Sequence, residues 1–192
     1  METSVKNPAK TKQAAEKGDR HQLCIDLLND AIGREIATSL QYMYFHARFE
    51  DARYEQLARM MRDISIAEMR HIEEFSDRIF FLEGDVNMNP AFDVRQMEDP
   101  AEILRFSMQL EQSTVEFYNE ASRLASENRD AVTHKLFQDF IEEEERHLDT
   151  FRTELQNLKD YGDNYLALQS AAGSKAAADA LHRVREETEK EE

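Results

Sequence analysis

Several features of secreted and membrane proteins are scarce or missing in this 192-residue chain. Cys24 is the only cysteine, which excludes an internal disulfide framework and a thiolate metal site and fits a reducing compartment. The N-terminus is polar and charged rather than an apolar signal segment. No stretch approaches the ~20 apolar residues of a membrane span. We therefore expect a cytoplasmic protein with no membrane partner.

Residues that interrupt helices are also rare, with five glycines and three prolines, and tryptophan is absent. Glu, Ala, Leu, Arg and Met are abundant, and this composition indicates a mostly helical protein. The 24 lysines and arginines stand against 40 acidic residues, so the net charge is −16. That charge argues against nucleic acid as a partner and favours solubility and the attraction of cations. The length allows one domain with a substantial core.

Apolar residues recur every three or four positions and predict an all-α protein with four long helices. We expect these helices at about residues 19–49, 52–82, 99–126 and 130–161, and a short fifth helix at 164–168. Asp99-Pro100 is typical of a helix start, while Gly84 and Gly162 are expected stops. The remaining divisions are a flexible arm at 1–18, the bundle with its short helix at 19–170, and a charged, mobile tail at 171–192.

One pattern of metal-ligand residues occurs twice. A glutamate is followed 33 residues later by a second glutamate and then, three residues on, by a histidine; the whole set recurs 76 positions further along. The two copies are Glu35, Glu68, His71 and Glu111, Glu144, His147. A single Glu or His on an apolar stripe is ordinarily a boundary residue with its polar end in water. Six such residues in matched register favour one shared metal site inside a four-helix bundle.

Helix geometry explains how these six residues could meet. A Glu and a His three positions apart share one face of a helix. The midpoints of the two 33-residue spacings fall at Asp51-Ala52 and Glu127-Asn128, where turns are expected. Each pair of carboxylates would then lie level, about 25 Å from its turn. Residues 83–98 can span about 50 Å, so we expect a single long crossover and parallel second and third helices rather than an up-down bundle.

The charge of the pattern indicates which ions it would hold. Four buried carboxylates would cost many kcal/mol without counter-charge, or would take up protons. Two Fe(II) ions carry four positive charges and balance them. Zinc prefers tetrahedral sites rich in His or Cys, whereas carboxylate-rich sites suit iron or manganese. Affinity alone does not separate iron from manganese, cobalt or zinc.

With these motifs, the sequence resembles the bacterioferritin family, the haem-containing ferritins. The similarity covers roughly residues 20–170. Its matching stretches are Leu28-Asn29 through Gln41-Tyr42, Ser65 through His71, Arg78 through Gly84, Leu110-Glu111, and Glu144 through Asp149. The resemblance implies a ferritin-like four-helix bundle with one long crossover and a short fifth helix.

The resemblance also implies roles for single residues. It implies two iron ions per subunit, each held by a glutamate and a histidine, with two further glutamates bridging both ions. The sets are Glu35 with His71, Glu111 with His147, and the bridging Glu68 with Glu144. Tyr42 would lie beside the ions, and Met69 from each of two subunits would ligate one b-type haem. Ordinary core packing for Tyr42 and an ordinary interface position for Met69 are the alternatives.

Two positions depart from the pattern of some family members, which carry a His and an Asp near the site. The corresponding residues here are Asp63 and Ala67. This departure leaves the ligands intact but opens the question of how iron would reach a mineral core. The run of acidic residues around Glu144 contains no other residue with the right spacing to His147. Its neighbours are expected to form a solvated face.

The activity implied by the resemblance is that of a ferroxidase. Fe(II) would be oxidised by O2 or peroxide and mineralised inside a hollow shell for storage and detoxification. The implied assembly is a 24-mer built from dimers, with a small redox donor for iron release. One alternative is a rubrerythrin-like di-iron peroxidase, although the Cys-rich segment common in rubrerythrins is missing. The other is a non-catalytic metal-binding bundle.

Overall fold

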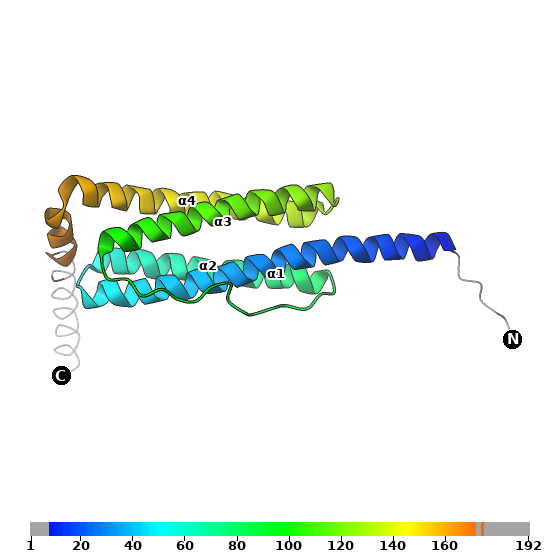
Figure 1. Ribbon diagram of the computed structural model, residues 1–192, viewed down its shortest axis with the longest axis horizontal. Helices are drawn as coiled ribbons and strands as arrows, with labels where there is room; N and C mark the ends of the chain where they lie inside the picture. The colour runs from blue at the N-terminus through cyan, green and yellow to red at the C-terminus, as the bar shows by residue number, and fades with distance from the viewer. Residues whose placement is uncertain (1–7, 172–173, 175–192) are drawn as a thin grey trace, which may run out of the picture.

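The computed structural model describes residues 8–171 and 174, and four long helices dominate that part of the chain. They are α1 (Pro8–Asp51), α2 (Glu55–Phe81), α3 (Pro100–Glu127) and α4 (Ala131–Tyr161). Residues 163–171 add a short fifth helical segment. Figure 1 shows α1 and α2 as one antiparallel pair lying against a second pair, α3 and α4. The prediction of a ferritin-like four-helix bundle is confirmed.

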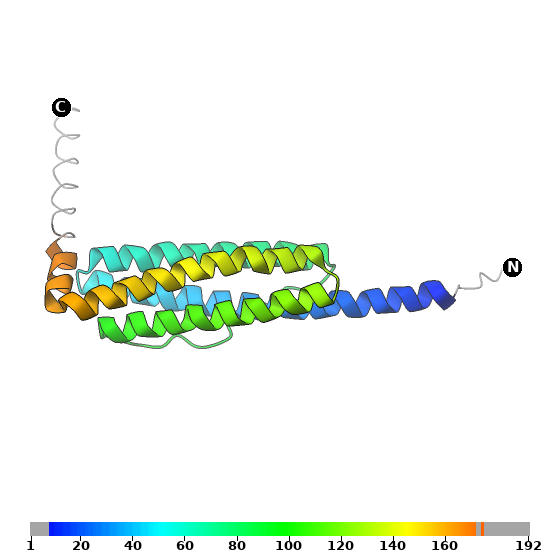
Figure 2. The same ribbon diagram turned by 90° about the horizontal axis from the view of Figure 1, so that it is seen from above.

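The start of the first helix was predicted wrongly. α1 begins at Pro8 rather than at Asp19, so the predicted flexible arm is helical from residue 8 onward. The segment is rich in Ala and Lys, which are good helix formers, and proline is favoured at a first helical position. The prediction failed because it required an apolar stripe, which this segment lacks. In Figures 1 and 2 this end of α1 extends beyond the rest of the bundle.

The remaining predicted segments at the chain ends are only partly covered. Residues 1–7 of the predicted arm lie outside the described residues. The same is true of the predicted tail, apart from residues 171 and 174. The predicted short helix near residue 164 is confirmed and is a few residues longer than expected.

The two hairpin turns are built alike. Each contains an arginine in the left-handed region, Arg53 with φ 64° and Arg129 with φ 62°, and these two residues are also 76 positions apart. The second turn is reinforced, because the Asp130 side chain accepts a hydrogen bond from the Thr133 N–H at the start of α4. Both turns lie where the midpoints of the 33-residue spacings predicted them.

The link between α2 and α3 runs back along the bundle, as Figure 1 shows for residues 82–99. Residues at three positions of α1 form hydrogen bonds with the main chain of this link. Asn29 and Gln41 each donate and accept one hydrogen bond with it, and the Gly33 carbonyl accepts one from the Ala91 N–H at 2.7 Å. A side chain at Gly33 would lie 3.1 Å from a crossover carbonyl, so glycine permits this approach. The predicted single crossover and parallel α2 and α3 are confirmed.

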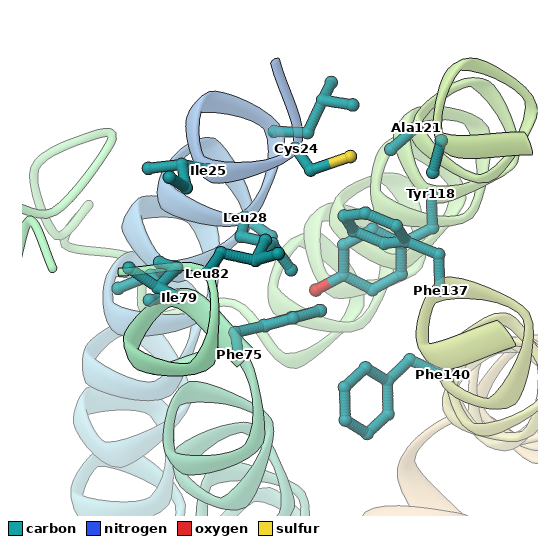
Figure 3. Packing of buried hydrophobic residues seen from close by; sticks show 14 residues of the cluster. Cys24, Ile25, Leu28, Phe75, Ile79, Leu82, Tyr118, Ala121, Phe137 and Phe140 are labelled. Carbon is teal, nitrogen blue, oxygen red and sulfur yellow. The ribbon is translucent and has the colours of Figure 1, made fainter. Parts of the chain in front are cut away.

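Apolar side chains form two clusters inside the bundle. One is built around Leu28, Phe75 and Phe137 and is shown in Figure 3. The other contains Phe45 and Phe151 and lies toward the first turn. In the described part of the chain, no helix has an apolar stretch long enough to cross a membrane. The predicted ligand residues lie between the two clusters.

Candidate metal centre

The structure brings all six predicted ligand residues together from four helices. They are Glu35 on α1, Glu68 and His71 on α2, Glu111 on α3, and Glu144 and His147 on α4. The four carboxylates and one imidazole are at most 1% exposed, and the other imidazole is 14% exposed at its side chain. This burial follows from the sequence, because each residue lies on the apolar stripe of its helix.

The residues form two overlapping groups that could each hold a cation. One group contains Glu35 and His71, the other contains Glu111 and His147, and both contain Glu68 and Glu144. Within each group the ligand atoms lie within 4.8 Å of one another. The shared glutamates, Glu68 and Glu144, are the two for which the family resemblance implies a bridging role.

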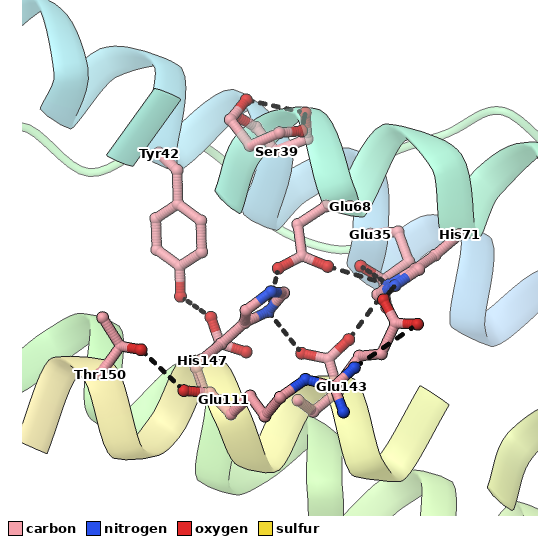
Figure 4. Close-up of polar contacts among 12 residues, drawn as sticks. Glu35, Ser39, Tyr42, Glu68, His71, Glu111, Glu143, His147 and Thr150 are labelled. Atoms are coloured by element: carbon pink, nitrogen blue, oxygen red, sulfur yellow. Dashed lines mark hydrogen bonds and ion pairs between the residues drawn. The ribbon is translucent and has the colours of Figure 1, made fainter. Parts of the chain in front are cut away.

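Distances around the imidazoles show how the shared carboxylates are oriented (Figure 4). His71 Nδ1 lies 3.0 Å from Glu68 Oε2 and 3.1 Å from Glu144 Oε1. His147 Nδ1 lies 3.1 Å from Glu68 Oε1 and 3.6 Å from Glu144 Oε2. Each shared glutamate therefore turns one oxygen toward each histidine, which is the orientation a bridging carboxylate needs.

The ligand atoms at the centre are better suited to binding metal ions than to forming hydrogen bonds with one another. Among the described residues, both carboxylate oxygens of Glu68, one oxygen each of Glu111 and Glu144, and Nδ1 of both histidines make no hydrogen bond, although both Nδ1 atoms lie within ion-pair distance of Glu68 and Glu144. An unsatisfied buried polar group costs about 1–3 kcal/mol, so six at one place would be a large penalty. Cations would satisfy them, and a centre of carboxylates with two imidazoles suits iron or manganese.

The charges of these groups are strongly coupled in the metal-free protein. Burial, together with the neighbouring carboxylates, raises the pKa of Glu35 and of Glu111 well above the usual range. Burial alone would lower the pKa of His147, but the neighbouring carboxylates of Glu144 and Glu68 raise it to about 9. The pKa of His71 is raised in the same way. Without a metal, these shifts favour protonated imidazoles that offset part of the carboxylate charge, and bound cations would displace those protons.

Two tyrosines cross the bundle to the terminal glutamates. The Tyr42 hydroxyl on α1 donates to Glu111 on α3, and the Tyr118 hydroxyl on α3 donates to Glu35 on α1. Tyr42 therefore lies beside the centre, as predicted. Tyr118 was not identified from the sequence as a site residue. The sequence nevertheless contains a signal for it. Tyr118 follows Glu111 by seven residues, just as Tyr42 follows Glu35, and the two tyrosines are 76 positions apart, which is the offset between the two ligand sets.

Glu143 was also missed. The residues around Glu144 were predicted as a solvated face, and Glu142 and Glu145 are indeed exposed. Glu143, however, is only 41% exposed at its side chain, and its Oε2 lies 3.2 Å from His71 Nε2. One residue turns a helix by about 100°, and that step points Glu143 toward α2 rather than toward water.

Met69 lies away from the centre. It follows Glu68 on α2 and is 46% exposed on the surface of the bundle. Its role as a haem ligand stays a prediction.

Comparisons with known proteins agree with this architecture. The family model of the ferritin-like domain matches residues 25–161. The bacterioferritin of Desulfovibrio desulfuricans is 34% identical across 80% of this chain and 86% of its own length. That of Rhodobacter capsulatus is 32% identical across 84% and 99%. An X-ray structure of the D. desulfuricans protein, which shows its di-iron site in different catalytic states, matches with a TM-score of 0.79 over 80% of this chain and 90% of that one. The chain belongs to the bacterioferritin family of ferritin-like proteins.

Proposed function

We propose that this protein is a ferroxidase that oxidises Fe(II) and stores the product. The observation that carries the proposal is the pair of overlapping ligand groups that share Glu68 and Glu144. Two cations held side by side by common carboxylates are arranged for a two-electron reaction. Oxidation of two Fe(II) ions releases two electrons, which reduce O2 to peroxide or peroxide to water.

The chain's own residues have distinct tasks in this proposal. Glu35 with His71 binds one Fe(II), Glu111 with His147 binds the other, and the shared glutamates span both. Entry of the ions releases the protons held on the histidines, because only the neutral imidazole offers a lone pair to a metal. Tyr42 and Tyr118 hold one oxygen of each terminal glutamate and leave the other available as a ligand.

Storage requires more than the centre. Self-assembly into a hollow shell, a 24-mer built from dimers, would enclose the oxidised iron, and a small redox donor would release it. Support comes from the family relationship and from the net charge of −16, which draws cations to the protein surface. The rubrerythrin-like alternative would instead leave a small assembly that turns over peroxide and keeps no iron.

Met69 fits a thioether ligand of a b-type haem shared by two subunits. Met69 is 46% exposed on α2, where a second copy of the chain could bring an equivalent methionine. A haem held there supplies one-electron transfer between the outside and the stored iron. No part of the proposed Fe(II) oxidation depends on it.

The proposal is tested by adding two Fe(II) per subunit to the metal-free protein in air. We expect rapid growth of the near-ultraviolet absorbance of Fe(III), followed by retention of iron in the assembled protein. Native mass measurement on the same sample reports the shell, and the visible spectrum reports the haem. Oxidation no faster than in buffer would refute the ferroxidase. A dimer that turns over peroxide without retaining iron would refute storage.

A further inference from the structure

The two histidines of the centre differ on the side that faces away from the ligand groups. Nε2 of His71 lies 3.2 Å from Glu143 Oε2 (Figure 4). Glu143 Oε1 lies in turn 3.7 Å from Arg146 Nη2. Within residues 8–171 and 174, Nε2 of His147 has no hydrogen-bond partner, since the ion pairs of that ring involve Nδ1. Only one of the two imidazoles is therefore held from both sides.

The internal repeat explains this difference. Moving back 76 positions from Glu143 leads to Ala67, which precedes Glu68 just as Glu143 precedes Glu144. By the symmetry of the two hairpins, residue 67 is placed to reach toward His147. A methyl group cannot accept a hydrogen bond, so the α1–α2 hairpin offers no carboxylate in this role.

We propose that Glu143 is a positioning residue for His71 and that Ala67 leaves His147 without one, so the two metal positions are inequivalent. A carboxylate that accepts the Nε2–H fixes the imidazole in one tautomer and orientation, and it makes the Nδ1 lone pair a better donor. The Glu35–His71 position should therefore bind a divalent cation more tightly than the Glu111–His147 position. This inference rests on the proposed function only in requiring that the centre holds two cations.

Cobalt(II) is the probe, because it binds sites of this kind and its visible absorption reports each equivalent without oxidation. The full-length, metal-free protein is titrated with Co(II) while heat and absorbance are recorded. We expect two binding steps. In Glu143→Ala the tighter step should weaken by about 10- to 100-fold, while the weaker step stays unchanged. Glu143→Gln retains an acceptor and should lose less.

Two matched variants separate positioning from charge. Glu145→Ala removes the same charge from an exposed neighbour and should move neither step. Ala67→Glu adds the missing acceptor at a half-buried position and should tighten the weaker step. Thermal unfolding of each metal-free variant shows whether the bundle is intact.

The possible outcomes are distinguishable. Equal weakening of both steps in Glu143→Ala, or the same loss in Glu145→Ala, would show a general charge effect and overturn the inference. Unchanged binding in Glu143→Ala would overturn it as well. A wild-type protein that binds fewer than two Co(II) ions per subunit would instead contradict the di-metal centre itself.

Discussion

The two hairpins of the bundle carry the same ligands in different surroundings. Glutamates, histidines and tyrosines repeat at an offset of 76, and so do the left-handed arginines of the turns. Around them the hairpins diverge. Asp130 caps α4 and pairs with Arg78, whereas among the described residues the equivalent Tyr54 makes no side-chain cap to α2. Exposed Met69 corresponds to Glu145. The repeated part therefore includes the ligands and the turn arginines, and the unrepeated part includes a helix cap, an outer-surface residue and the Glu143 contact to His71.

Substituting the bridging glutamates should have the largest effect on the rate of Fe(II) oxidation. It tests whether the two hairpins contribute equally to the centre. Glu68→Ala and Glu144→Ala should each lower the initial rate of Fe(II) oxidation by at least about 100-fold, because each glutamate belongs to both ligand groups. The rates are measured by stopped-flow absorbance. As a control, Glu142→Ala, on the exposed face of α4, should keep its rate. A large loss in only one of the two variants would show that Glu68 and Glu144 do not both bridge the two ligand groups.

The Asp130–Arg78 pair gives the largest expected effect on stability. Arg78 Nη2 lies 2.7 Å from Asp130 Oδ1, and both side chains are mostly buried. Asp130→Ala removes this pair and a helix cap, and should cost about 3 kcal/mol in the free energy of unfolding. Asp99→Ala removes only a cap, at α3, and should cost about 1 kcal/mol. Chemical denaturation of the metal-free proteins measures both. Equal costs would show that the pair adds nothing to the cap.

The same pair predicts a dependence on pH. Burial alone would raise the pKa of Asp130, but hydrogen bonds from Arg78 and the Thr133 N–H lower it to about 2. Because the folded pKa lies below the unfolded value of about 3.9, the stabilisation is complete above pH ~4 and is lost as the pH falls toward 2. The stability difference between wild type and Asp130→Ala should therefore shrink in acid. A difference that stays constant from pH 6 to pH 3 would contradict this prediction.

The crossed tyrosines provide a smaller, matched comparison. Tyr42→Phe removes the hydrogen bond to Glu111, and Tyr118→Phe removes the one to Glu35. Each change leaves a buried oxygen unsatisfied and should cost about 1–3 kcal/mol in the metal-free protein, with little change of shape. Thermal and chemical unfolding should give similar costs for the two variants. Clearly unequal costs would mean that the terminal glutamates differ in ways that the repeat does not show.

Met69 should matter least to the centre. Met69→Leu keeps volume and hydrophobicity and should change stability by less than about 1.5 kcal/mol. Fe(II) oxidation should stay at the wild-type rate, while the visible absorption of bound haem should disappear. Met43→Leu, at another exposed methionine, controls for loss of any surface thioether. If the Met69→Leu variant still bound haem, Met69 would not be the haem ligand.

Most of the helices and the metal centre could be predicted because their signals are local and periodic. Spacings of three, four and 33 residues fix which side chains share a face and lie level, as Glu68 and His71 do on α2. The start of α1 could not be predicted from that signal, because residues 8–18 form a helix without an apolar stripe. The contacts of Tyr118 and Glu143 were missed for a different reason: each joins helices that are distant in the sequence.

By itself, the sequence determined the four helices, the doubled ligand pattern and the level at which its carboxylates meet. These follow from the fixed rise and rotation per residue of a helix. Only the tertiary structure decided which tyrosine reaches which glutamate, that Glu143 supports one histidine while Ala67 leaves the other unsupported, and how the crossover lies along α1. Such choices depend on how the helices pack and rotate against one another, and no spacing within a single helix contains that information.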